Sequence, residues 1–151
     1  MIYQALLALT AGAAIAIQAG LNARLGVLLD NALYASAAAF FFSFLFICVV
    51  LVSTTGLSFN AETLKGIPFY LWFAGASLSA YGVGMMYHLI PQAGVGTVMS
   101  YALTGQLVTA MLISHFGLFQ LPADPVSGVK IVGIVSLIIG VTLINLDVNF
   151  S

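Results

Sequence analysis

The chain has 151 residues, of which 62% are hydrophobic and only 5% are charged, namely 3 Lys or Arg and 4 Asp or Glu. Soluble domains carry roughly 25% charged residues, so this chain could not cover a folded surface in water, and its natural solvent is a lipid bilayer. The net charge of −1 supplies no basic surface for a phosphate backbone, which excludes nucleic-acid binding.

Apolar runs of about 20 residues, the length at which a helix crosses a bilayer, recur along the chain. We predict an all-α, polytopic membrane protein with residues 1–151 as a single transmembrane domain. Pro68 is expected to begin the third span, and Pro91 to end it in a tight turn with Gln92, because proline breaks a helix interior. Gly, Ser, Thr and Gln dilute the hydrophobicity of the fourth span most. The five predicted spans are residues 3–23, 32–54, 68–90, 93–116 and 126–146.

An odd number of spans places the two termini on opposite sides of the membrane. Lys65, in the polar loop 55–67, and Lys130 then lie on the N-terminal side, and Arg24 lies on the other. Two against one is a small bias for the rule that Lys and Arg gather in cytoplasmic loops. Two interpretations stay open: the N-terminal side is cytoplasmic and the charges are too few to show it, or the chain inserts in both orientations.

Small residues four positions apart let membrane helices pack closely. The longest such series, in the first span, is Ala8, Gly12, Ala16 and Gly20. Shorter series are Ala76, Ala80 and Gly84 in the third span, Gly96, Ser100 and Thr104 in the fourth, and Ser136 and Gly140 in the fifth. The second span has no such series. Its five phenylalanines are expected to face lipid on one side and to fill a bulky core on the other; they are Phe40, Phe41, Phe42, Phe44 and Phe46.

Polar side chains inside spans are the best pointers to function, because an unpaired polar group in lipid costs free energy. No carboxylate, Lys or Arg lies in the central part of a predicted span. Gln18, with Asn22 one turn later, and Gln106 are the strongest neutral candidates. These amides either bond helix to helix or line a solute cavity. Weaker candidates are Ser77, Ser79, Tyr81, Ser100, Tyr101 and Thr104, whose hydroxyl groups either line that cavity or bond within the protein.

The remaining polar residues fit positions near the membrane surface. His88 and His115 fall near opposite ends of spans, so they cannot readily form a metal pair. Arg24 either extends to the interface or lies at the mouth of an aqueous cavity, and Cys48 is interpreted as a small hydrophobe. No enzyme motif is present, so no catalytic residue, metal or cofactor is predicted. The expected interface anchors are Tyr3, Tyr34, Tyr70, Trp72 and Tyr87.

Two segments carry a resemblance to a known family. The first, Gln18-Ala19-Gly20-Leu21-Asn22-Ala23-Arg24-Leu25-Gly26, closes the first span. The second comprises Gly105-Gln106-Leu107 and His115-Phe116-Gly117-Leu118-Phe119. With five spans in about 150 residues, these segments resemble the YdcZ family of bacterial inner-membrane proteins, which is similar to the drug/metabolite transporter superfamily. That family often has an acidic residue before His-Phe-Gly, where this chain has Ser114, so the resemblance does not extend to a proton-linked role there.

The resemblance implies a multi-pass protein of the bacterial inner membrane that is half of a ten-helix, inverted-repeat transporter. Its partners would be the lipid bilayer, a small-molecule solute, and a second copy inserted upside down, or an oppositely oriented paralogue. Small multidrug exporters of this superfamily use a glutamate in the first span. Since the first span here has no carboxylate, a neutral or anionic solute is expected instead. The predicted solute-binding residues are Gln18, Asn22, Arg24, Tyr81, Ser100, Tyr101, Thr104 and Gln106. The alternative is a non-transporting assembly or accessory subunit, which would need the same packing but no polar cavity.

Overall fold

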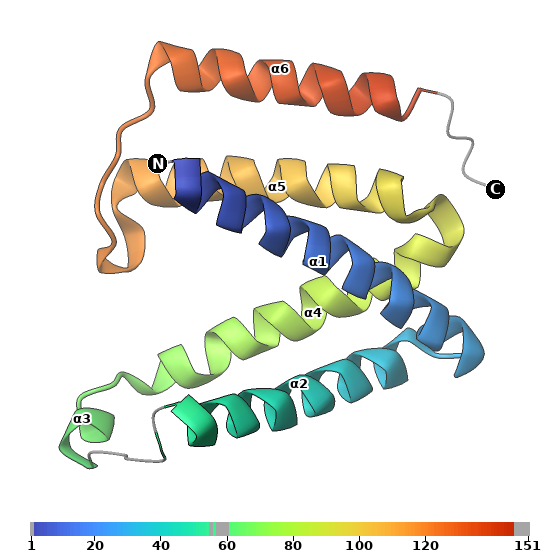
Figure 1. The fold of residues 1–151 in the computed structure, drawn as a ribbon. Helices are drawn as coiled ribbons and strands as arrows, with labels where there is room; N and C mark the ends of the chain where they lie inside the picture. The colour runs from blue at the N-terminus through green and yellow to red at the C-terminus, as the bar shows by residue number, and fades with distance from the viewer. Residues whose placement is uncertain (1, 55, 57–60, 147–151) are drawn as a thin grey trace. The chain divides into compact units, whose positions relative to one another are not determined.

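The computed structural model describes residues 2–54, 56 and 61–146 (Figure 1). All of its regular structure in this part of the chain is helical, which confirms the predicted all-α class. The long helices are α1 (Ile2–Leu28), α2 (Ala32–Thr54), α4 (Phe69–Ala93), α5 (Val95–Phe116) and α6 (Gly128–Ile144). Two short helices lie in the connections, α3 (Ala61–Lys65) and the 3-10 helix η1 (Leu118–Gln120). The chain divides into two compact units, Met1–Pro91 and Gln92–Ser151.

Three of the described helices, α1, α2 and α5, are long and apolar enough to cross a membrane. The fourth predicted span, residues 93–116, corresponds to α5. It is therefore one of these three candidate membrane spans, although its sequence contains the most polar and small residues. The helix α6 is apolar but has 17 residues, fewer than the 21 predicted for the fifth span. The helix α4 has 25 residues, but Ser, Tyr, Gly, His and Gln side chains lower its hydropathy.

In the first unit, a three-residue turn joins α1 to α2. Asp30 adopts the left-handed conformation, with φ of 52°, and its N–H donates to the Val27 carbonyl at 3.2 Å. The Asn31 N–H donates to the Gly26 carbonyl at 2.9 Å, which completes a Schellman motif at the end of α1. The Asn31 side chain then accepts a 2.8 Å hydrogen bond from the Leu33 N–H and so caps the start of α2. The sequence therefore ends one helix and begins the next with two adjacent residues.

The two helices pack closely near this turn and diverge away from it (Figure 1). Small residues are buried on both helices, namely Ala19, Ala23 and Gly26 on α1 and Ala35 and Ser36 on α2. A Cβ placed on Gly26 would lie 3.3 Å from the Ala32 Cα. On α4, Gly84 packs against Leu33 and Ser36 of α2, whereas Ala76 and Ala80, the other members of the small-residue series predicted for the third span, are exposed.

The small-residue series predicted for the first span is not the packing face within the chain. A Cβ on Gly12 would meet nothing within 4 Å, and the buried face is shifted toward the C-terminal end of α1. The same holds for Gly96 and Gly140, which also have open space around them. Small residues permit two helices to approach closely, but the position of the neighbouring helix determines which small residues are in contact.

The phenylalanine-rich middle of α2 was expected to fill a core on one side, and that expectation is wrong. Each of its five phenylalanines is at least 40% exposed, because α1 has already diverged from α2 at this height. All of these rings are surface groups of the chain.

The helix α4 continues through Pro91 to Ala93, contrary to the predicted turn at Pro91-Gln92. Proline removes one backbone donor, but at two residues from the helix end it interrupts only the last turn. The break falls at Gly94, whose φ of 85° and ψ of 154° are accessible essentially to glycine alone.

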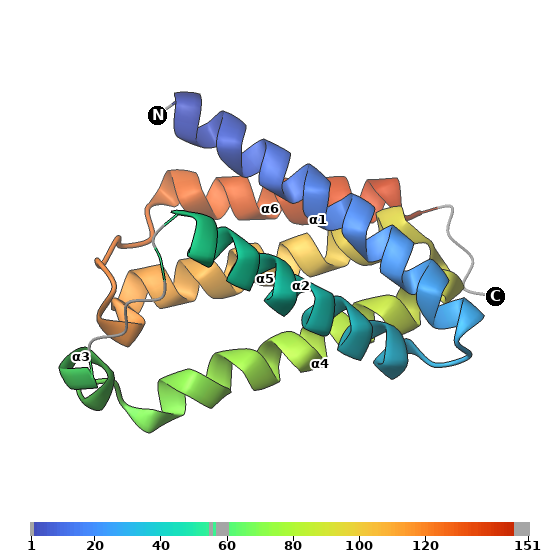
Figure 2. The same ribbon diagram turned by 60° about the horizontal axis from the view of Figure 1, so that its bottom comes forward.

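In the second unit, α5 and α6 lie side by side and antiparallel (Figures 1 and 2). Gly117 ends α5 in the left-handed conformation, with φ of 58°, and Phe119 and Gln120 in η1 also have positive φ. An extended segment then leads to Ser127, whose hydroxyl accepts a 3.3 Å hydrogen bond from the Lys130 N–H and caps α6.

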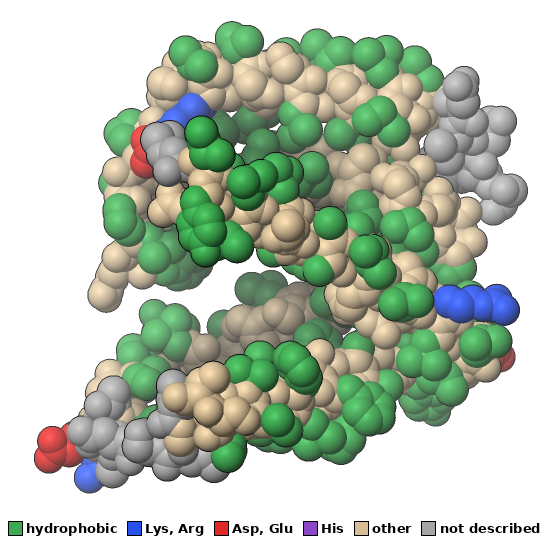
Figure 3. All heavy atoms as spheres, viewed as in Figure 1, with side chains coloured by type: hydrophobic (Ala, Val, Ile, Leu, Met, Phe, Trp, Pro, Cys, Tyr) green, Lys and Arg blue, Asp and Glu red, His purple; other side chains and the backbone are tan. Residues whose placement is uncertain are grey.

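Apolar side chains cover the surfaces of these helices (Figure 3). Among the described residues, few hydrophobic side chains are buried, and these are Ala19, Ala23, Ala35, Tyr87, Ile90, Val98 and Val141. On the face drawn in Figure 3, charged side chains lie only at helix ends and in connections. A surface of this kind is stable in lipid, where each helix satisfies its own backbone hydrogen bonds.

Candidate functional site

A cluster of three neutral polar side chains joins α1 to α4 in the first unit. The amide nitrogens of Gln18 and Asn22 both donate to the Tyr87 hydroxyl, and the Asn22 bond measures 2.9 Å. Gln18 and Asn22 are four residues apart and so share one face of α1. Tyr87 is only 2% exposed and is the largest fully buried side chain described. We call Gln18, Asn22 and Tyr87 the amide–tyrosine cluster.

The cluster has hydrogen-bonding capacity beyond the bonds within it. A phenolic hydroxyl carries one proton of its own, and each amide has a carbonyl oxygen that accepts hydrogen bonds. With one N–H of each amide donating to Tyr87, the second N–H and the carbonyl oxygen of each amide remain for further hydrogen bonds, as does the proton of the buried tyrosine. The arrangement is uncharged and offers both donors and acceptors.

The cluster lies away from the ends of its helices, and of its three side chains Tyr87 is buried, Asn22 half-buried and Gln18 exposed. Gln18 is three residues, or about 4.5 Å along the axis, from the midpoint of α1. Tyr87 is six residues, or about 9 Å, past the midpoint of α4. The buried Tyr87 hydroxyl needs a hydrogen-bond partner, because an unpaired polar group away from water costs free energy. The two amides of α1 supply such bonds.

Tyr87 was predicted to anchor the chain at the membrane surface, and that interpretation is wrong. Because α4 extends to Ala93, the ring lies inside the helix and packs toward α1. A signal was present in the sequence: Tyr87 is three residues beyond Gly84 and therefore continues the small-residue face of the third span.

Arg24 and Tyr81, also predicted to bind solute, have exposed side chains. Arg24 is on α1, two residues after Asn22, and Tyr81 is at the middle of α4 with 70% of its surface exposed. The structure therefore joins Gln18 to Asn22 through Tyr87, and it leaves Arg24 and Tyr81 on the surface of the first unit.

The second unit holds another polar pair, between Ser100 of α5 and Asn145 at the end of α6. The Asn145 amide nitrogen donates to the Ser100 hydroxyl at 2.9 Å and to the Val141 carbonyl at 2.7 Å. Since the Val141 carbonyl can only accept, it fixes the orientation of the amide. The Asn145 carbonyl oxygen is then buried without a hydrogen-bond partner among the described residues.

Ser100 was a predicted site residue, whereas Asn145 was not singled out. An asparagine in the last turn of a span is typical of a helix end, so nothing in the amino-acid pattern distinguishes Asn145 as a site residue. The hydroxyls of Ser100 and Thr104 also bond to carbonyls of their own helix, at 2.8 and 2.9 Å. Tyr101 and Gln106 have exposed side chains on α5.

Among the described residues, no three His, Cys, Asp or Glu side chains gather as a metal site would require. His115 instead accepts a 3.1 Å hydrogen bond through Nδ1 from the Val126 N–H.

Long helices with apolar surfaces and neutral polar clusters define an all-α membrane protein. The chain belongs to the YdcZ family, described as "Putative inner membrane exporter, YdcZ", which it matches over residues 3–143. This match covers nearly the whole chain and confirms the resemblance drawn from the sequence motifs. It places the protein in the inner membrane and among transporters rather than enzymes. Comparisons with curated proteins and with solved structures found no match.

Proposed function

We propose that two copies of this chain, inserted in opposite orientations, form an exporter of small neutral or anionic solutes. The observation that carries the proposal is the amide–tyrosine cluster, an uncharged group with donors and acceptors inside otherwise apolar helices. The chain functions as a single transmembrane domain, and a central polar cavity forms near the membrane midplane of the pair.

The number of helices supports a pair of chains. Transporters of the inverted-repeat type bind solute between two halves of opposite orientation. A chain with five long helices supplies one such half, and an upside-down copy or a paralogue supplies the other. The open space around Gly12 on α1 leaves a small-residue surface through which a second chain can approach.

The chemistry of the candidate residues supports the solute class. Neutral amides and hydroxyls orient a solute through hydrogen bonds without the large desolvation cost of a buried charge. Gln18 and Asn22 act here with Tyr87, and Gln106, Ser100, Thr104, Tyr81 and Tyr101 line the same solute path in this proposal. Arg24, two residues beyond Asn22, attracts anions to the mouth of the cavity.

A non-transporting accessory subunit is the second candidate, and one observation favours it. Both amides of α1 already donate to Tyr87, as they would if the cluster served only to tie α1 to α4. The two functions therefore differ in whether the cluster also contacts solute.

The first experiment separates these functions with the variant Gln18→Leu. A panel of neutral and anionic metabolites is screened for thermal stabilisation of the purified full chain, and the hits are tested for uptake into liposomes. Exporter function predicts that Gln18→Leu folds but loses stabilisation by the hits and their transport. The matched control is Gln4→Leu, the same change on α1 far from the cluster, which should keep both.

If Gln18→Leu binds and transports normally, the cluster does not contact solute. If the variant fails to fold while the control folds, the glutamine is a structural tie and the accessory function is favoured.

A second experiment tests the opposite orientations. Reporter fusions at the C-terminus should give mixed topology for the wild-type chain. Two or three lysines added to the loop 55–67 should make it one-sided, because they fix that loop in the cytoplasm. A wild-type chain that is already wholly one-sided excludes dual insertion, although a paired paralogue would still supply the second half.

A further inference from the structure

A pocket of about 200 Å³ opens beside the connection between α5 and α6. Its apolar lining comes from Leu107, Ala110, Met111 and Val126, and its polar lining from Ser114, Asp124 and Lys130. This volume is below the roughly 300–1,000 Å³ of pockets that enclose a whole drug-sized ligand, so the pocket holds only part of a larger molecule. Apolar walls beside a pair of opposite charges suit an amphipathic ligand.

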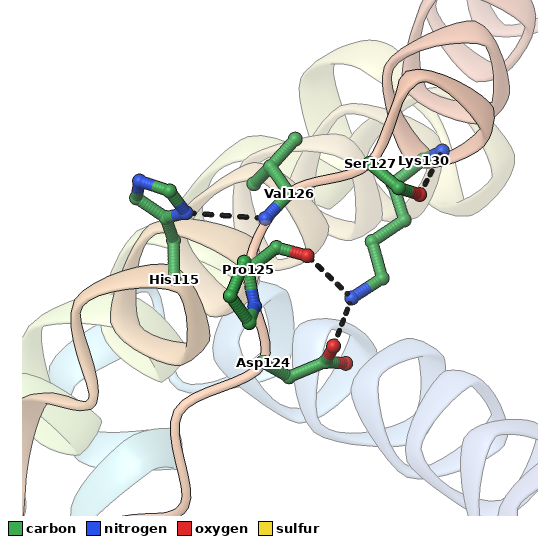
Figure 4. Close-up of polar contacts among 6 residues, drawn as sticks. All are labelled: His115, Asp124, Pro125, Val126, Ser127 and Lys130. Atoms are coloured by element: carbon green, nitrogen blue, oxygen red, sulfur yellow. Dashed lines mark hydrogen bonds and ion pairs between the residues drawn. The ribbon is translucent and has the colours of Figure 1, made fainter.

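The two charges are held side by side (Figure 4). The Lys130 ammonium lies 2.6 Å from the Asp124 carboxylate and donates to the Pro125 carbonyl at 3.2 Å. The backbone fixes this segment to the end of α5, because the Asp124 N–H donates to the Ser114 carbonyl at 2.8 Å. The bond from the Val126 N–H to His115 Nδ1 adds a second attachment (Figure 4).

Both members of the ion pair have hydrogen-bonding groups that remain available to a ligand. An ammonium group has three N–H donors, of which Lys130 uses two in these contacts. The Asp124 carboxylate contacts Lys130 through one oxygen only, and its side chain is 68% exposed. A ligand with a positive and a negative group a few ångströms apart would match the pair in reverse, its cation on Asp124 and its anion on Lys130.

The surroundings indicate that this ligand is a membrane lipid. The pocket lies where α5 ends and α6 begins, at the level of the lipid headgroups if these helices span the bilayer. The neighbouring residues Phe116, Leu118, Phe119 and Leu121 are apolar and exposed, between 44% and 68% each, as expected for a segment immersed in lipid. A lipid can place its hydrocarbon against the apolar wall and its headgroup on the ion pair.

We infer that this pocket binds a zwitterionic phospholipid with a primary ammonium headgroup, that is, an ethanolamine lipid. Its phosphate accepts a hydrogen bond from Lys130, and its ammonium donates to Asp124. A choline headgroup has the same charges but no N–H donor, so it forms no such bond to the carboxylate. The preference for ethanolamine over choline is therefore the signature of the site.

The experiment measures lipid retention on the purified full chain by native mass spectrometry. The probes are palmitoyl-oleoyl phosphatidylethanolamine, phosphatidylcholine and phosphatidylglycerol, each added to the delipidated protein. We expect the ethanolamine lipid to bind about fivefold more tightly than the choline lipid, as for one exposed charge-assisted contact of about 1 kcal/mol. Equal binding of these two lipids to the wild type overturns the proposal.

Variants then test the two charges separately. Asp124→Asn should abolish the preference for ethanolamine over choline, and Lys130→Gln should weaken all three phosphate lipids. Lys65→Gln, which removes a lysine from α3 in the other unit, is the matched control and should change nothing. A preference that survives Asp124→Asn contradicts the assignment of the carboxylate.

Two further measurements test whether the ligand occupies this pocket and whether it is a lipid. Ala110→Phe fills the pocket without touching the charges and should reduce retention of the ethanolamine lipid, whereas unchanged retention would overturn the site. Water-soluble glycerophosphoethanolamine carries the same headgroup without hydrocarbon and should not compete at millimolar concentration. Effective competition would mean that the pocket serves a soluble zwitterion, and the lipid would be rejected as its occupant.

Discussion

The close approach of α1 and α2 can be tested by adding one methyl group at two glycines of the same helix. In Gly26→Ala the new Cβ would lie 3.3 Å from the Ala32 Cα and 3.5 Å from the Ala35 Cβ. In Gly12→Ala it would meet nothing within 4 Å. The two variants share the chemical change and the helix, so the difference between them isolates the contact.

The expected magnitudes follow from two opposing terms. Alanine favours a helix over glycine by about 0.8–1.0 kcal/mol, and both variants gain this term. At Gly26 the methyl group also comes closer to a backbone carbon than the optimal separation of about 3.5–4.0 Å. The backbone can yield only if the turn shifts, and overpacking of this kind costs about 1–3 kcal/mol. Gly12→Ala should therefore be stabilised by about 1 kcal/mol, and Gly26→Ala should be unchanged or destabilised.

The assay is reversible unfolding of the full chain in mixed detergent micelles, followed by circular dichroism and fitted to a free energy of unfolding. The reasoning is refuted if Gly26→Ala is as stable as Gly12→Ala. Gly12→Leu adds a further distinction. The leucine side chain has room on the surface of a single chain, so each chain should stay folded. If two chains pack through the Gly12 surface of α1, the leucine should reduce dimer formation.

Three other substitutions test local features. Asn31→Ala removes the cap of α2 and should cost about 1 kcal/mol in the same unfolding assay, whereas no loss would show that the turn is held by its backbone alone. Gly117→Ala places a side chain at φ of 58° and 3.3 Å from the Ala123 Cβ, so it should lose about 1–2 kcal/mol, and a neutral result would contradict the left-handed cap. A double-mutant cycle of Ser100→Ala with Asn145→Ala should give a coupling energy of about 0.6 kcal/mol, the mean for hydrogen bonds between membrane helices, and additivity would mean that the bond contributes nothing.

The sequence predicts the helices better than their contacts. The apolar runs give the number and approximate position of the long helices, because a bilayer imposes a minimum length on each. The rule for proline misplaced the end of α4, since it describes helix interiors and Pro91 lies in a last turn.

The packing faces were harder to predict, because α1 carries two series of small residues. One contains Gly12 and the other contains Ala19, Ala23 and Gly26, and only the second packs within the chain. The choice depends on where α2 lies, which is fixed by the turn at Asp30 and Asn31 and not by the composition of α1.

The sequence predicted some residues of the candidate site but not their partners. Gln18 and Asn22 stand out because amides are rare in apolar spans and these two share a face. Their common partner, Tyr87, was assigned to the interface because tyrosine is usually found there, and only the path of α4 brings it to α1. Asn145 became notable only through its buried carbonyl oxygen, a property of three-dimensional packing.

The short turn between α1 and α2 has a consequence for how the protein enters the membrane. The hairpin depends on contacts that are local in sequence, so it can form as soon as α2 has been synthesised. Carrying the turn across the bilayer moves Arg24 and Asp30, one positive and one negative charge. The membrane potential does work of about 2.3 kcal/mol per elementary charge per 100 mV, and for this pair the two contributions cancel. The electrical cost of inserting the first hairpin is therefore the same from either face of the membrane.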